Sequence, residues 1–509
     1  MTVEIVNAPP RPAVPAAVAP RLWPAVLRRC VLAPLVVLLP LVALTPAADH
    51  RFNVYANGGR YLSRPWLLPR AVAESVPTYL DLGNFRPLGR LVEWSLDVAA
   101  FALTELLAVP ANISLRIVSF GAAMLLTLVA VVFAESLTAR GRLFARPSVL
   151  VALLPFAVAA GFVAAGRTST TVLFGGLYFT SAALVLAVAA WACRCRRPGL
   201  LVFVAGAALA AFNEIAYLAV PLATAAVLLR GRLVRRQRLR GPAMRFVVLL
   251  WAGFLPVFVP VRLLIRQRCA DGGCYAGSDI ALAGAPAAVP NRLVSWLPPL
   301  MWQRATDGVP ANPVGLLPLL ALLALAVLAW RAARQLPHLA MLDRRQALAL
   351  AGVAAVALLL AATLAALNAD VQQLAAHGKW GQGWRDSAVT TAAGGILLLC
   401  PVAAGRRVLV VPVLAVLVVT GAFSVAANQD FRDGSGGGRF PYLHDRIAQE
   451  VAGFDPTAAG NARRCALRDA FRANNHLGAD APELERFDVS LDRATMQLAG
   501  RPFCLGAAR

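Results

Sequence analysis

Three groups of residues in this chain have side chains and positions that could do chemistry at one membrane surface. Asp49 follows the first hydrophobic segment, and Glu214 interrupts a long apolar segment near the middle of the chain. A third group, between residues 377 and 386, holds Lys379, Arg385 and Asp386. A carboxylate can act as a general base, and arginine can bind phosphate through two parallel hydrogen bonds. A carboxylate and arginines at one surface would together suit group transfer from a phosphate-bearing substrate.

Each group also has a plainer interpretation. Asp49 could simply end the first membrane span at the water interface, and Glu214 could be a surface turn residue. The two tryptophans between 377 and 386 are typical of the aromatic belt at a membrane surface, where Lys379 and Arg385 would be ordinary interface cations. Residue type alone leaves both interpretations open. Ionisable residues near membrane depth are costly, so all of them stay candidates.

Residues 48–112 form a long segment between the first two hydrophobic spans. It holds Asp81 and the turn Arg86-Pro87-Leu88, so Asp81 and Arg86 join the candidate substrate-binding residues. An amphipathic stretch follows at 88–107, and its polar residues Arg90, Glu93, Asp97 and Thr104 recur at helical spacing. This pattern is typical of a helix that lies in the membrane interface.

Composition places the whole chain in a membrane. Of its 509 residues, 59% are hydrophobic and 15% charged, and the mean hydropathy is +0.65, which exceeds what a soluble core can bury. The net charge of +23 is nearly all arginine, because Lys379 is the only lysine; this bias indicates a GC-rich, bacterial genome. The arginines gather at the ends of spans, which favours contact with membrane lipid. Basic patches with interleaved aromatics are missing, so nucleic acid is not an expected partner.

Hydrophobic segments and arginine clusters together predict about eleven transmembrane helices, with the N-terminus cytoplasmic and the C-terminus outside. The apolar run 200–229 is too long for one span, and Asn213-Glu214 divides it into two short ones. With this division every arginine cluster falls on the same side. The expected spans lie near 30–47, 113–134, 148–165, 171–192, 200–229 (two), 246–265, 314–330, 346–367, 388–404 and 408–426.

We therefore predict an all-α polytopic membrane protein of the plasma membrane in three parts. Residues 1–29 are rich in proline and alanine and read as a disordered cytoplasmic tail. Residues 30–426 form the membrane domain, whose large first extracytoplasmic loop carries interfacial helices. Residues 427–509 are polar and are expected to form a small extracytoplasmic domain, helical with some β structure.

Cysteine positions fit this topology. Cys269, Cys274, Cys465 and Cys504 fall outside, and their even number suits oxidised pairs in an oxidising compartment. Cys269 could pair with Cys274, and Cys465 with Cys504. Cys193 and Cys195 have no nearby histidine and do not form a zinc-binding set, so no metal site is predicted.

The layout resembles that of the GT-C membrane glycosyltransferases, which include protein O-mannosyltransferases and arabinosyltransferases. Their large first outer loop begins with an acidic residue straight after the first span, where Asp49 stands here. Arg86-Pro87-Leu88 looks like the turn before that loop's helix, and Asn213-Glu214 is similar in position to a Lys-Glu turn between two middle spans. The paired acidic motif of the superfamily is absent, because Asp49 is followed by His50; this departure puts metal-assisted chemistry in doubt.

The resemblance implies a glycosyltransferase that moves a sugar from a polyprenyl-phosphate donor to a glycan, lipid or protein acceptor in the cell envelope, without a cofactor. Asp49 would activate the acceptor hydroxyl, and Arg86 and Arg385 would stabilise the leaving phosphate. The alternatives are a transporter or lipid flippase, and a non-catalytic envelope assembly protein. Against a transporter, the sequence has no evident inverted halves, and its charges gather at the outer surface.

Overall fold

The computed structural model describes residues 22–42, 44, 50–109, 111–236, 241–270, 274, 280–306, 315–436, 446–447, 449–451, 453–473 and 482–506. Over these residues the chain is helical, and its only β contacts are two isolated bridges, Ser148 to Ala340 and Ile280 to Asn368. The β structure expected in the C-terminal part is therefore not found in the ranges just given.

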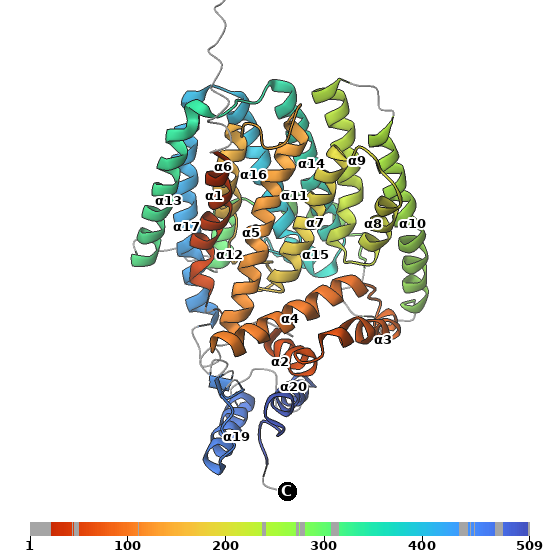
Figure 1. Ribbon diagram of the computed structural model, residues 1–509, viewed down its shortest axis with the longest axis vertical. Helices are drawn as coiled ribbons and strands as arrows, with labels where there is room; N and C mark the ends of the chain where they lie inside the picture. The colour runs from red at the N-terminus through yellow and green to blue at the C-terminus, as the bar shows by residue number, and fades with distance from the viewer. Residues whose placement is uncertain are drawn as a thin grey trace, which may run out of the picture.

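Within the described ranges, nine helical segments are long and apolar enough to cross a membrane, and they stand side by side in one bundle (Figure 1). Two shorter apolar helices, α6 (Val149–Ala160) and α8 (Leu200–Ala210), stand at two of the predicted spans. The protein is thus a multi-pass helical membrane protein. The long segments contain α1 (Leu22–Leu38), α5 (Ala111–Thr138), α7 (Gly175–Arg194), α9 (Ala219–Leu229), α10 (Pro242–Arg268), α13 (Leu316–Gln335), α14 (Arg344–Ala366), α16 (Ser387–Ala404) and α17 (Val410–Gly436).

The apolar run 200–229 is broken at the predicted residues. Helix α8 ends at Ala210, and the short helix η4 (Ile215–Leu218) begins directly after Glu214. Asn213 is buried at this break: its amide nitrogen donates to Ser181 Oγ at 2.7 Å, and its Oδ1 accepts from the Ala216 N–H at 3.0 Å. These bonds fix the turn, so the run forms two helices.

Hydrogen bonds from arginine join the connections between helices at one end of the bundle. Arg230 donates to the carbonyls of Leu137 and Cys193, at 3.1 and 3.0 Å, which ties the ends of α5 and α7 to α9. Arg146 and Arg407 both donate to the carbonyl of Leu339, at 3.2 and 2.8 Å. We call this the arginine-rich end; the connections at 139–147, 194–199, 230–236, 336–343 and 405–407 meet there, as the predicted topology requires.

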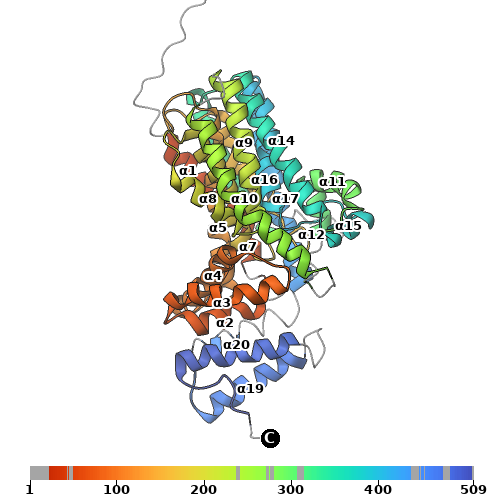
Figure 2. The same cartoon turned by 90° about the vertical axis from the view of Figure 1, so that its right-hand side faces the viewer.

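The first loop lies across the opposite end of the bundle (Figures 1 and 2). It contains α2 (His50–Tyr61), η3 (Pro65–Leu67), α3 (Leu68–Asp81) and α4 (Pro87–Leu107). The expected amphipathic helix, α4, is present, but Leu106 and Leu107 at its end are exposed. Its polar face is directed into the protein, where the side chains of Arg90, Glu93, Asp97 and Thr104 are buried.

Beside this end, three short helices gather on one side of the bundle (Figure 2). They are α11 (Ala285–Val294), α12 (Pro298–Ala305) and α15 (Ala369–Ala376). Helix α11 packs on α14 and α15, and α12 packs on α17. They come from two connections that lie far apart in the sequence.

The predicted boundary of the N-terminal tail is wrong. Helix α1 begins at Leu22, so residues 22–29 belong to the bundle; residues 1–21 lie outside the described ranges. Arg29 is buried because its guanidinium has partners, donating to the Ala152 carbonyl at 3.3 Å and to the side chain of Gln335. The positive charge of Arg29 has a sequence position typical of the end of a membrane span, yet it lies inside the bundle.

The predicted boundary between residues 426 and 427 falls inside α17, which continues to Gly436. Asn428 looks like the start of a polar segment but is buried. Its amide nitrogen donates to the carbonyls of Val37 and Phe162 at 2.9 Å, and its Oδ1 accepts from the Ala164 N–H at 2.7 Å. The side chain satisfies irregular backbone after α6, and the helix continues past it.

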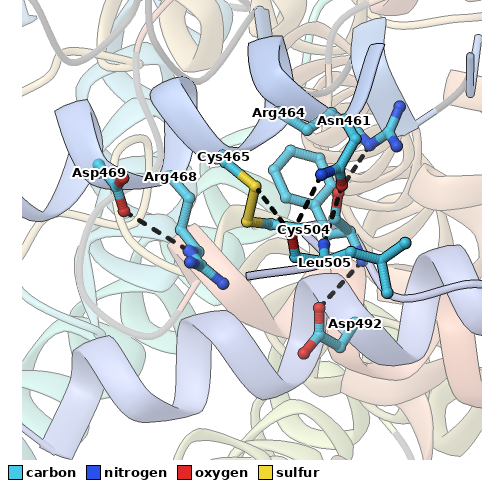
Figure 3. The surroundings of a disulfide bond; sticks show 9 residues. Asn461, Arg464, Cys465, Arg468, Asp469, Asp492, Cys504 and Leu505 are labelled. Carbon is cyan, nitrogen blue, oxygen red and sulfur yellow. Dashed lines mark hydrogen bonds and ion pairs between the residues drawn. A yellow bond between two sulfur atoms is a disulfide. The ribbon is translucent and has the colours of Figure 1, made fainter. Parts of the chain in front are cut away.

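In the C-terminal part, α19 (Ala458–Ala473) and α20 (Pro482–Ala499) pack together, and a disulfide joins Cys465 to Cys504 (Figure 3). Asn461 donates to the Leu505 carbonyl at 3.1 Å and accepts from its N–H at 2.9 Å. The chain after α20 is thus tied back onto α19.

The C-terminal helices share a hydrophobic core with the first loop. Val54 of α2, Phe101 of α4, and Phe487 and Leu491 of α20 belong to one buried cluster. The fit is close: a Cβ added to Gly59 would lie 2.2 Å from Cα of Ala494. The predicted outer domain therefore packs directly on the first loop.

Candidate functional site

A cavity of about 380 Å³ lies where the first loop meets the bundle. We call it the loop-side cavity. It gathers three of the predicted site residues, Glu214, Arg385 and Asp386. Its other walls come from the turn before α4, η4, α10, the segment before α11, the end of α14 and the segment before α16. The residues are Gly83, Phe85, Ile215, Tyr217, Phe258, Arg262, Ile280, Leu364, Ala365, Leu367, Asn368 and Trp384.

The N-terminus of α4 docks on the turn that carries Glu214. The N–H groups of Leu88 and Gly89 donate to the carbonyls of Ala211 and Phe212, at 3.0 and 3.1 Å. The first N–H groups of a helix lack partners within the helix, and here the end of α8 supplies them. A Cβ at Gly89 would lie 2.1 Å from the Phe212 oxygen, so this contact requires glycine. It brings Arg86, just before α4, next to Glu214.

Arg86, Glu93, Glu214 and Arg385 form a group of opposite charges, in which Glu93 is buried and the other three side chains are half-buried. Nη2 of Arg86 lies 3.9 Å from Oε2 of Glu93. Burial alone would lower the pKa of Arg86, but Glu93, Tyr178 and Glu214 outweigh it and raise that pKa. Burial alone would raise the pKa of Glu214, but the charges of Arg86 and Arg385 lower it. Both groups are therefore ionised at neutral pH.

One carboxylate oxygen of this group is available to a ligand. Glu214 Oε2 is buried and has no hydrogen-bond partner among the described residues. A buried acceptor left unsatisfied costs about 1–3 kcal/mol, and more when it is charged. Glu214 lines the loop-side cavity, so a hydroxyl of a bound molecule could supply the missing bond.

The lining of the cavity combines two arginines with apolar residues and with the carboxylates of Glu214 and Asp386. Arg262 of α10 donates to the Tyr217 hydroxyl at 3.0 Å. The guanidinium carbon of Arg385 lies 5.6 Å from the ring centre of Trp384. Phe85 and Phe258 are among the apolar residues around them. The cavity is suited to an amphiphile with an anionic group.

Asp386 lines the cavity, but its negative charge is balanced by an arginine of the protein itself. Its carboxylate pairs with Arg292 of α11, and both side chains are almost fully buried, at 1% and 2% exposure. Arg292 also donates to the Gln382 carbonyl at 2.6 Å. The pair anchors the segment 382–386 and thereby positions Arg385.

Glu93 connects the cavity's charges to a second buried group. With His50 and Asp97 it lines a small space beside α5 and α7. Asn57 donates to Asp97 Oδ2 at 2.8 Å. Burial raises the pKa of Asp97 well above its usual value, and the charge of Glu93 adds to this, partly offset by Asn57. Burial, together with repulsion from Arg116, lowers the pKa of His50 to about 3.

The remaining predicted residues lie elsewhere. Asp49, the predicted base, lies outside the described residues, although the next residue, His50, begins α2. Lys379 is exposed and does not line the loop-side cavity. Asp81 is also outside the lining; it pairs with Arg268 and so ties the end of α3 to the end of α10. The adjacent disulfide joins Cys269 to Cys274.

Sequence reasoning missed Arg262, Tyr178, Glu93 and Asp97 as members of the site. The sequence does indicate Arg262, because an ionisable residue inside a predicted apolar span is by itself a candidate site residue. Glu93 and Asp97 had an ambiguous one, since the same spacing also fits a helix at the membrane surface. Tyr178 had none, as its neighbours come from other segments.

Comparison with protein-family models, with curated proteins and with solved structures finds no match for this chain. In the described ranges, no group of three or more His, Cys, Asp or Glu side chains is placed to hold a metal ion.

Proposed function

We propose that this protein is a GT-C-type membrane glycosyltransferase that uses a polyprenyl-phosphate sugar, with the arginine-rich end in the cytoplasm and the loop-side cavity at the outer face. One observation carries this proposal. The loop-side cavity combines apolar walls with Arg262, Arg385 and the unpartnered oxygen of Glu214. A polyprenyl-phosphate sugar has a matching apolar chain, anionic phosphate and hydroxyl groups.

In the proposed reaction, Arg262 and Arg385 hold the phosphate through charge-assisted hydrogen bonds, and Glu214 accepts one from a sugar hydroxyl. The acceptor oxygen attacks the anomeric carbon, and the bond from that carbon to the phosphate oxygen breaks. The acceptor's proton passes to Asp49, and polyprenyl phosphate leaves with the electron pair. Fixed arginines stabilise the charge that develops on the phosphate. The half-buried Arg86 adds positive potential beside Glu214.

The ligand part of this proposal is tested by binding of undecaprenyl phosphate to the full-length protein in phosphatidylcholine nanodiscs. Arg262→Gln should weaken binding about tenfold, the effect of losing one charge-assisted contact. The matched control is Arg266→Gln, because Arg266 lies one turn further along α10, is exposed and is outside the cavity lining. Its affinity should stay within about twofold. Equal affinities in all three proteins would reject the cavity as the phosphate site.

The transfer part is tested with Asp49→Asn and an undecaprenyl-phosphate sugar, following release of undecaprenyl phosphate with water or a short glycan as acceptor. The variant should bind the donor like the wild type and release about a hundredfold less undecaprenyl phosphate, because general-base catalysis is lost. A flippase or assembly protein would bind the donor, but any release of undecaprenyl phosphate would be the same in the wild type and in Asp49→Asn. That result would overturn the enzymatic proposal.

A further inference from the structure

The arginine-rich end contains a second, larger cavity, of about 740 Å³. It lies between the ends of α5 and α7, the segment after α9 and the start of α10. Six arginines line it: Arg140, Arg142, Arg194, Arg196, Arg230 and Arg235; none of the described residues that line it is acidic. Topology alone would explain arginines at this end, but not their convergence on one hollow.

Two of these arginines are fixed by the end of α5. Arg194 donates to the carbonyls of Ala139 and Gly141, both at 3.0 Å. Arg230 donates to those of Leu137 and Ala139, at 3.1 and 3.0 Å. Carbonyls at a helix C-terminus carry partial negative charge and hold cations well. They orient the two guanidinium groups but do not neutralise them, so the positive charge remains at the cavity wall.

Two acids lie near the six arginines, and they balance only part of the charge. Asp343 pairs with Arg140, and Glu135 interacts with Arg194 from behind the cavity wall. Arg235 is close enough to both Arg194 and Arg230 to repel them. Bringing like charges together in this way is unfavourable unless an anion relieves the repulsion.

The backbone also departs from an ordinary helix here. Residues Arg230–Arg235 form a π-helix, η5, whose ends both line the cavity. The wider turn of a π-helix pairs residues five apart, and such turns recur at functional sites. A regular α-helix would direct Arg230 and Arg235 to different sides, so η5 increases the convergence of charge.

We infer that this cavity binds a phosphate group, separately from the loop-side cavity. Arginine forks match phosphate oxygens, and basic pockets between membrane helices bind anionic headgroups. The volume lies within the range of small-molecule sites. Leu143, Val227 and Met244 add apolar contacts beside the arginines. The phosphate is carried by a lipid headgroup or by a soluble phosphate compound, and both present the same chemistry to the cavity.

The test uses two double variants of the full-length protein. Arg142→Gln with Arg235→Gln removes two exposed arginines from the cavity wall and leaves the carbonyl contacts of Arg194 and Arg230 in place. Arg232→Gln with Arg236→Gln removes two exposed arginines of the same region that do not line it. Binding is measured for diphosphatidylglycerol by native mass spectrometry, and for inorganic pyrophosphate by calorimetry in phosphatidylcholine nanodiscs.

The cavity variant should bind at least one probe about tenfold or more weakly than the wild type, and the control within about twofold. Loss for diphosphatidylglycerol alone assigns a lipid headgroup, and loss for pyrophosphate alone assigns a soluble phosphate compound. Equal losses in both variants would mean that only total charge matters and would overturn the inference. Unchanged binding in both variants, or no binding by the wild type, would overturn it as well.

Discussion

The two ends of the bundle carry charge in different ways. At the arginine-rich end the charge is mostly positive, with Asp343 and Glu135 beside the arginines; it comes from clusters that are local in sequence, and is partly exposed or bound to helix carbonyls. At the loop end the charges have both signs, are buried or half-buried, and come from segments far apart in the chain, such as Arg86, Glu214 and Arg385. Topology explains why arginines gather at the first end, but not why six of them line one cavity. The arrangement at the loop end forms only when the fold is complete, which is typical of a site.

The sharpest way to test this difference is to break one ion pair at each end. Arg292→Leu leaves Asp386 buried without its partner, and we expect a loss of about 3–5 kcal/mol in the free energy of unfolding. Arg140→Leu breaks a pair whose side chains are 62% and 41% exposed, and we expect about 1 kcal/mol or less. Denaturant unfolding in detergent micelles measures both.

A double variant separates the charge from the loss of packing. Replacing both Arg292 and Asp386 by leucine removes the unpaired carboxylate and should recover most of the stability lost in Arg292→Leu. If Arg292→Leu and Arg140→Leu cost the same, the two ends would not differ in the way described.

Gly89→Ala tests whether the close docking of α4 on the turn at Glu214 shapes the loop-side cavity. The new Cβ would collide with the Phe212 carbonyl, so α4 must move away from the turn at Glu214, at a cost of about 1–3 kcal/mol. The control is Gly121→Ala in α5, where no other side chain or distant backbone atom lies within 4 Å. Melting temperature should fall for Gly89→Ala and change little for Gly121→Ala. Undecaprenyl phosphate binding should fall only for Gly89→Ala; normal binding there would show that α4 does not shape the cavity.

The smallest expected effect concerns pH and Asp97. Burial raises the pKa of Asp97 in the folded state above its unfolded value, so between these two values the folded protein holds more protons. This stabilisation is present at low pH and is lost as pH rises toward the folded pKa. Asp97→Asn removes the dependence, so its melting temperature relative to the wild type should increase from about pH 4 upward. A constant difference across pH would show that Asp97 does not titrate in this way.

The sequence was sufficient for features that depend on local pattern. Hydropathy located the long helices, and the polar pair Asn213-Glu214 marked the break in the run 200–229. The sequence does not show which distant groups bind a polar side chain and so allow it to lie inside the bundle. Arg29 and Asn428 read as the flanks of spans, yet distant carbonyls accept their hydrogen bonds. The spacing in α4 showed that one face is polar, but not that this face points inward.

The candidate site was predictable to the same extent. Glu214, Arg385 and Asp386 are unusual for their local setting in the sequence, and they line one cavity. Asp81 and Lys379 are unusual in the same sense but lie outside its lining. Whether two such residues meet depends on how α4 docks on the end of α8. That contact is made by backbone groups, which leave little trace in side-chain pattern beyond a single glycine.

The core shared by α2 and α20 has a consequence for how the protein is made. The ribosome makes α2 well before α20, so the apolar face around Val54 and Phe101 is uncovered while the helices between them are made. During that interval the first loop is without the helix that covers it. A chain that stops before α20 leaves this apolar face uncovered. Only molecules in which α20 has been made and has docked can complete the shared core.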